Sequence, residues 1–84
     1  MSSQYWKNFG ENVRSLREEA GMNQEQFAEK VFKEPLSDSL IGAWERAERK
    51  AKAENILEIA DHFHKSLDAL FGRNPKGGPI KKKK

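Results

Sequence analysis

Apolar residues recur every three or four positions along the first seventy residues, and this spacing predicts a series of amphipathic helices. Ser2 or Ser3 can cap the first helix, and Gly21 can end it in a left-handed conformation. The apolar side of this helix consists of Trp6, Phe9, Val13, Leu16 and Ala20. The first helix is therefore predicted to contribute to the core.

A second helix is predicted after Asn23, whose side chain can cap it. Its inward face consists of Phe27, Ala28 and Val31. Pro35 is expected to stop this helix, because the proline ring has no N–H and pushes Glu34 toward an extended conformation.

Ser37 can cap a third helix, which follows at once. Ile41, Trp44 and Glu45 lie on one side of it, because they are spaced at i, i+3 and i+4. The opposite side presents Ser39, Gly42, Ala43 and Arg46. Two short helices joined by a few residues form a helix-turn-helix, in which the second helix projects its outer face.

Two further helices complete the predicted all-α domain. The fourth helix follows the basic residues Arg46, Arg49, Lys50 and Lys52. Its predicted buried stripe consists of Ile56, Leu57, Ile59, Ala60 and Phe63. Ser66 can cap a last short helix, which Gly72 ends. The apolar residues of this last helix are Leu67, Leu70 and Phe71.

Charge is distributed unevenly along the chain. Residues 1–72 contain 10 Lys and Arg against 13 Asp and Glu, a net charge of −3, whereas residues 73–84 carry a net charge of +6. Turn formers and like charges fill this Lys-rich tail, and such a composition cannot offset the entropy of ordering. We therefore expect a helix-turn-helix domain in residues 1–72 and a disordered tail in residues 73–84. An acidic domain weighs against DNA binding, because phosphate neutralisation supplies much of the affinity for DNA.

Length and residue usage narrow the possible functions. A chain of 84 residues forms one small domain, without room for a deep catalytic cavity as well as a core. The chain has no Cys, no glycine-rich phosphate loop and no nucleophile beside a base, so the sequence predicts neither an enzyme nor a cofactor. His62 and His64 point to different faces of a helix and are interpreted as surface residues, so no metal site is predicted. The longest apolar runs are too short for a membrane span and no export signal is evident, so we expect a cytoplasmic protein.

Matches to a known pattern run in order from residue 9 to residue 71. The matching segments are Val13–Arg17, Met22–Ala28, Ile41 with Trp44–Arg46, Ile56–Ala60 through Phe63, and Ser66–Leu70. With these segments the chain resembles the Cro and lambda-repressor type of helix-turn-helix family, also called the xenobiotic-response-element type. The resemblance implies a five-helix fold that binds double-stranded DNA.

The chain departs from the family pattern in two places. Extra residues in the turn between Phe32 and Leu36 lengthen the connection between the second and third helices, which can change the angle of the third helix. The family usually has Gly where this chain has Ala47 and Pro where it has Ala51. Because both helix breakers are missing, the third helix could run on through Ala53, which would reposition Arg49 and Lys50.

The resemblance also implies a DNA-binding face on the second and third helices. Gln24 would reach a phosphate with its amide, although a solvent-facing glutamine explains this residue nearly as well. Ser37 and Asp38 would lie at the leading end of the third helix, and the negative charge of Asp38 suits a helix N-terminus better than base reading. The residues toward the bases would be Ser39, Gly42, Ala43 and Arg46, of which only Arg46 can contact guanine through two hydrogen bonds. Arg49 and Lys50 complete this candidate DNA-binding set.

Two further implications concern the fold. In the family, the positions of Arg17 and Glu45 form an ion pair that ties the first helix to the third. Leu67, Leu70 and Phe71 are a candidate surface for a homodimer.

Two functions remain open. The first is a sequence-specific DNA-binding transcriptional regulator of the repressor type, phage- or prophage-like, that acts as a dimer on a two-fold site. The second is an antirepressor, or another protein-binding module, that captures a repressor's DNA-binding domain through the same two helices. The acidic domain, Asp38, Leu40 and the small, flat face of Gly42 and Ala43 suit packing against a basic protein surface. The resemblance favours the first function.

Overall fold

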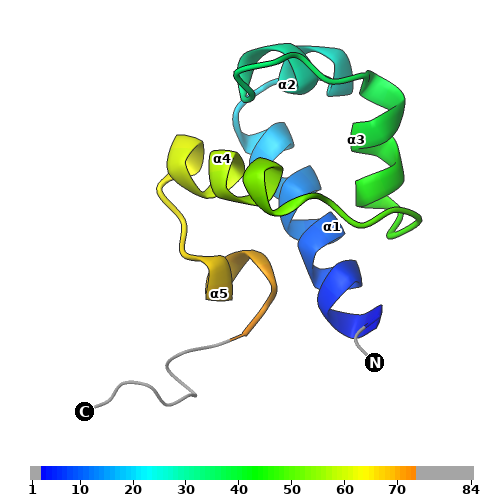
Figure 1. Cartoon of the computed structure of the whole chain (residues 1–84), viewed down its shortest axis with the longest axis vertical. Helices are drawn as coiled ribbons and strands as arrows, with labels where there is room; N and C mark the ends of the chain where they lie inside the picture. Colours follow the sequence, from blue (N-terminus) through cyan, green and yellow to red (C-terminus); the bar gives the residue numbers. More distant parts are fainter. Residues whose placement is uncertain (1–2, 74–84) are drawn as a thin grey trace.

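The computed structural model describes residues 3–73, which form five helices and no strand (Figure 1). The predicted all-α, five-helix order is confirmed. The helices are α1 (Ser3–Glu19), α2 (Gln24–Lys30), α3 (Asp38–Glu45), α4 (Ala53–Phe63) and α5 (Leu67–Leu70). No helix within these residues is long and apolar enough to cross a lipid bilayer. Residues 74–84, most of the tail expected to be disordered, lie outside the described residues.

The predicted caps position most of the helices. Asn23 accepts a hydrogen bond from the N–H of Gln26, while the side chain of Gln26 accepts one from the N–H of Asn23, each over 2.8 Å. The side-chain oxygens of Ser37 and Ser66 cap α3 and α5. Gly21 adopts a left-handed conformation, and the following N–H bonds back to a carbonyl of α1, which ends this helix as expected.

The helix α2 ends earlier than the sequence predicts. It stops at Lys30, before Pro35, so the assignment of Pro35 as the residue that stops this helix is wrong. The carbonyl of Ala28 accepts a hydrogen bond of 3.1 Å from the N–H of Leu36, across the turn, instead of from the next turn of a continuing helix. Residues 31–37 therefore form the connection to α3.

The helix α3 ends at Glu45 and does not run on toward Ala53, although both helix breakers of the family are missing. Ala47 occupies the left-handed position that glycine usually fills, with φ of 59°. Its N–H bonds to the carbonyl of Trp44 at 3.0 Å, and the N–H of Glu48 bonds to the carbonyl of Ala43 at 2.8 Å. These two hydrogen bonds satisfy the end of the helix and offset the strain at Ala47.

The core lies between all five helices and is rich in aromatic side chains. Trp44 of α3 contacts Phe9 of α1 and Phe32 of the turn, with ring centroids 6.1 and 5.8 Å apart. The burial of Phe32 was not predicted. Two expected core positions are instead exposed, because Ala20 follows the end of α1 and Leu57 lies on the outer side of α4 with 51% of its surface exposed. The fully or nearly fully buried residues include Val13, Phe27, Ala28, Ile41, Ile59 and Leu70.

The helices α1 and α3 approach each other closely at Gly10. A methyl group at this position would overlap the backbone carbonyl oxygen of Trp44 and would lie 2.9 Å from that of Glu45. Glycine is therefore required at residue 10 for the two backbones to meet. This contact holds α3 beside α1 (Figure 1).

Two asparagines of α1 hold the C-terminal end of α5. Asn12 donates to the carbonyl oxygens of Leu70 and Ala69, at 2.9 and 3.1 Å, and Asn8 donates to that of Phe71 at 3.1 Å. Because α5 has only four residues, these side chains satisfy carbonyls that the helix itself leaves free. The first and last helices are thereby joined.

Candidate nucleic-acid interface

The outer side of α3 is less open than the sequence suggests. Ser39 and Arg46 are exposed, Ala43 is half-buried and Gly42 is buried. A methyl group added to Gly42 would lie 3.1 Å from Nη1 of Arg46 and 3.3 Å from Oε1 of Gln24. The side chains of Gln24 and Arg46 thus cover Gly42. The expectation that Gly42 faces a partner is contradicted, because these two longer side chains lie over it.

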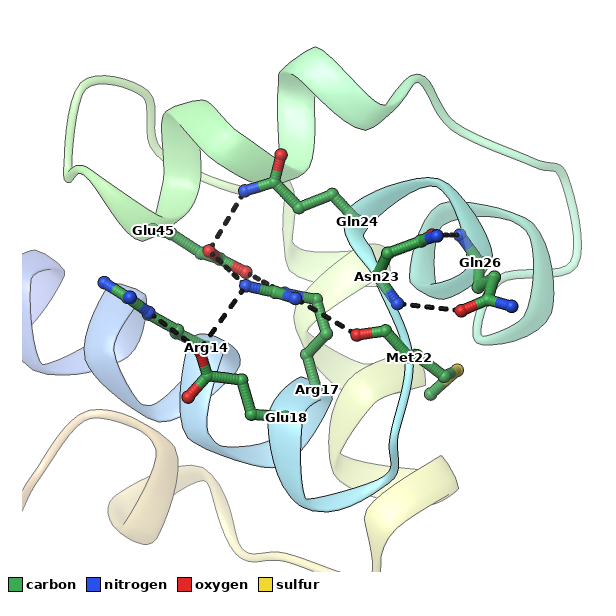
Figure 2. A network of polar contacts seen from close by, with 8 residues as sticks. All are labelled: Arg14, Arg17, Glu18, Met22, Asn23, Gln24, Gln26 and Glu45. Carbon is green, nitrogen blue, oxygen red and sulfur yellow. Dashed lines mark hydrogen bonds and ion pairs between the residues drawn. The ribbon is translucent and has the colours of Figure 1, made fainter.

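The inner side of α3 carries a polar network that connects three helices (Figure 2). Arg17 and Glu45 form the ion pair that the resemblance implies, through hydrogen bonds of 2.7 and 3.1 Å. Their side chains are only 13% and 6% exposed. Arg17 also donates to the carbonyl oxygen of Met22 at 3.0 Å. The hydrogen bond to Glu45 raises the pKa of Arg17 above its ordinary value, so Arg17 remains charged.

Gln24 belongs to this network and is not a free solvent-facing side chain. Its Nε2 donates to Oε1 of Glu45 at 3.1 Å, so the amide is held in one orientation (Figure 2). Glu45 therefore orients both Arg17 from α1 and Gln24 from α2. The resemblance implies only the pair of Glu45 with Arg17, because a contact between the start of α2 and the end of α3 depends on how these two helices cross.

The leading end of α3 is polar and open to solvent. Ser37, Asp38 and Ser39 are all exposed. Ser37 caps the helix by accepting a hydrogen bond of 3.2 Å from the N–H of Leu40. Asp38 lies in the first helical turn, where a negative charge interacts favourably with the helix dipole.

Basic residues follow the other end of α3. Arg46, Arg49 and Lys50 are exposed, and the last two lie in the connection to α4 because α3 does not run on. Arg46 forms an ion pair of 3.0 Å with Glu48. This hydrogen bond lowers the pKa of Glu48, so the pair is charged on both sides at neutral pH.

The candidate dimer residues do not share one surface. Leu70 is 1% exposed and belongs to the core, so its assignment to a dimer surface is wrong. Leu67 is 47% exposed and Phe71 is half-buried. These two residues line a shallow hollow of about 350 Å³ together with Tyr5 and Trp6 of α1 and the charged residues Asp68 and Arg73.

Within residues 3–73 no group of three or more His, Cys, Asp or Glu side chains could hold a metal ion. His62 is exposed with its ring beside that of Phe63, and His64 is exposed in the left-handed residue that ends α4. Both histidines lie at the end of α4 and not on α2 or α3.

Comparisons with known proteins show which protein family the chain belongs to. Searches of curated proteins and of solved structures found no match. A family model described as helix-turn-helix matches residues 13–70, which include the end of α1, both helices of the motif, α4 and α5. The model covers more than half of the chain, and five helices in this order agree with it. The chain therefore belongs to the Cro and lambda-repressor type of helix-turn-helix family, which is a family of DNA-binding domains.

Proposed function

We propose that the protein is a sequence-specific transcriptional regulator of the repressor type that binds DNA through α2 and α3. The observation that supports this proposal most is the fixed position of α3. Gly10 and the pair of Arg17 and Glu45 hold its inner side against α1, while Ser39 and Arg46 on its outer side stay exposed. A recognition helix must be held rigidly and must present side chains that fit a major groove.

The outer side of α3 suits base contacts of different strength. Arg46 can donate two hydrogen bonds to guanine, and Ser39 can bond either kind of base edge. Ala43 is small and can contact the methyl group of thymine. Asp38 contributes less, because its charge repels phosphate.

The ends of the motif suit contacts with phosphates. Nε2 of Gln24 carries two hydrogens, and Glu45 accepts one of them, so the second is left for a phosphate oxygen. The exposed side chains of Arg49 and Lys50 in the connection to α4 can neutralise further phosphates. The Lys-rich tail would add affinity that does not depend on sequence, so truncation after Gly72 should weaken binding to all DNA sequences equally.

A homodimer on a two-fold DNA site is part of this proposal. The proposed dimer surface is the hollow that Tyr5, Trp6, Leu67 and Phe71 line. It differs from the surface expected from the sequence because Leu70 is buried. Leu67→Lys should shift the protein to the monomer in sedimentation equilibrium while leaving the fold intact.

The test of DNA reading compares variants on the outer side of α3. Selection from random DNA should enrich one site, and binding to it should fall steeply with salt. Arg46→Ala should weaken that site by about 1–3 kcal/mol and relax preference at one base pair. Asp38→Asn should leave binding unchanged or tighten it. The proposal is wrong if no site is enriched, or if Arg46→Ala leaves both the affinity for the enriched site and the base preference unchanged.

The second candidate function is capture of a repressor's basic DNA-binding domain. It is favoured by the net charge of −3 on residues 1–72 and by the ion pair that engages Arg46 with Glu48. In that case Asp38→Asn should abolish binding to the partner, whereas Arg46→Ala should have little effect. A pull-down with a repressor domain, run beside the DNA measurements on the same variants, distinguishes the two functions.

A further inference from the structure

The turn between α2 and α3 is longer than in the family pattern, so something must fix its conformation. Residues 31–37 form this turn, in which Val31 and Phe32 are buried, Leu36 is half-buried and the other residues are exposed. The ring of Phe32 lies in the core, 5.8 Å from the rings of both Phe27 and Trp44. The N–H of Leu36 bonds back to Ala28. Both of these contacts stay within the motif itself.

One hydrogen bond connects the turn to the rest of the domain, in addition to the apolar packing of the turn in the core. Oε2 of Glu58, on α4, accepts a hydrogen bond of 3.1 Å from the backbone N–H of Lys33. Among residues 3–73, Glu58 is the only hydrogen-bond partner of this turn that lies outside α2, α3 and the turn itself.

Glu58 is itself held in place by a neighbouring side chain. Its Oε1 accepts a hydrogen bond of 3.0 Å from Nδ2 of Asn55, one turn earlier on α4. Asn55 is the only polar residue among those buried in the described part of the chain. A carboxylate that accepts one hydrogen bond on each oxygen has a fixed orientation, so the position of α4 is transmitted to Lys33.

We propose that Glu58 is a positioning residue for the recognition helix. By holding Lys33, it fixes the path of the lengthened turn and therefore the angle at which α3 leaves it. Glu58 lies on α4, outside the motif, and acts on DNA only through the turn. This inference rests on the proposed function, because it assigns to Glu58 a role in the sequence preference of α3.

The loss of the Glu58 carboxylate should have different effects on DNA binding, depending on whether Glu58 acts through its charge alone or by positioning the turn. Removing a carboxylate from an acidic domain raises affinity for any DNA, because it reduces repulsion of phosphates. Releasing the turn instead lowers the ratio of specific to nonspecific affinity, because a mobile recognition helix makes its base contacts less often. Glu54 supplies a matched control, since it is exposed one turn earlier on the same helix and its side chain makes no hydrogen bond or ion pair among residues 3–73.

The experiment measures binding of the full chain to its enriched site and to random DNA for Glu58→Ala, Glu58→Gln and Glu54→Ala, well below each melting temperature. For Glu58→Ala we expect the ratio of specific to nonspecific affinity to fall about ten-fold. A change of this size is within the range known for residues that do not contact the ligand. Glu58→Gln keeps one oxygen for Lys33 and should lose less, and Glu54→Ala should keep the ratio. The proposal is overturned if Glu58→Ala and Glu54→Ala change binding equally.

Hydrogen exchange of the Lys33 amide separates failure of this inference from failure of the proposed function. In Glu58→Ala this amide should exchange at least several-fold faster, and the NMR signals of α3 should shift, whether or not the protein binds DNA. If these changes occur but no DNA site is enriched, the positioning of α3 stands and the DNA function falls. If the Lys33 amide exchanges as in the unchanged protein, Glu58 does not position the turn.

Discussion

The two sides of α3 differ in what holds them. The inner side meets the backbone of α1 at Gly10, buries Ile41 and Trp44, and places Glu45 in an ion pair that is almost entirely removed from solvent. The outer side carries small or polar residues, and its longest side chain, Arg46, is exposed and forms an ion pair with the exposed Glu48. The inner side therefore determines stability and the position of the helix, whereas the outer side is left to determine what the helix binds.

Breaking the ion pair on the inner side should have the largest effect. Arg17→Ala and Glu45→Ala should each destabilise the fold by about 3–5 kcal/mol, because each strands a buried charge. The double variant should lose less than the sum, because the second change removes the stranded partner. Thermal or urea unfolding of the three variants measures this coupling. Strictly additive losses would mean that the two charges do not depend on each other.

A methyl group at Gly10 tests the close approach of α1 and α3. Helix propensity alone predicts that Gly10→Ala stabilises α1 by about 1 kcal/mol. The overlap with the carbonyl oxygens of Trp44 and Glu45 predicts a net loss of about 3 kcal/mol instead, because backbone cannot move aside as a side chain can. Urea unfolding gives the sign. A gain in stability would show that the two helices have room to separate.

Replacing Ala47 tests the backbone strain just after the end of α3. Ala47→Gly should stabilise the fold by about 1 kcal/mol, because glycine adopts the observed left-handed conformation without strain. The control is Ala53→Gly at the start of α4, which should destabilise, because residue 53 is helical. The melting temperature should rise for Ala47→Gly and fall for Ala53→Gly. If Ala47→Gly also lowered the melting temperature, Ala47 would not be strained.

The smallest expected effect concerns the outer side alone. Glu48→Gln frees the guanidinium of Arg46 from its ion pair and should tighten binding to the enriched DNA site a few-fold, with little change in stability because the pair is exposed. Glu29→Gln is the control, because it removes one negative charge from an exposed residue of α2 and so reduces the repulsion of phosphates without touching Arg46. Binding at several salt concentrations measures both variants. Equal tightening by the two would mean that the ion pair does not restrain Arg46.

The hydrophobic periodicity and the capping residues determined the number, order and approximate bounds of the helices. Asn23, Ser37 and Ser66 cap as predicted because a side-chain cap bonds within its own first turn and needs no distant partner. Residues that match the family pattern in order, from residue 9 to residue 71, also indicated the family. Local sequence was less reliable for the ends of helices, since α2 stops before Pro35 and α3 stops without the glycine expected after it.

Only the tertiary structure decided which side chains meet across elements. It placed Gly42 beneath Gln24 and Arg46, buried Leu70, exposed Leu57 and joined Glu58 to the turn. These outcomes depend on the angles and distances between helices, which the spacing of residues along one helix does not contain.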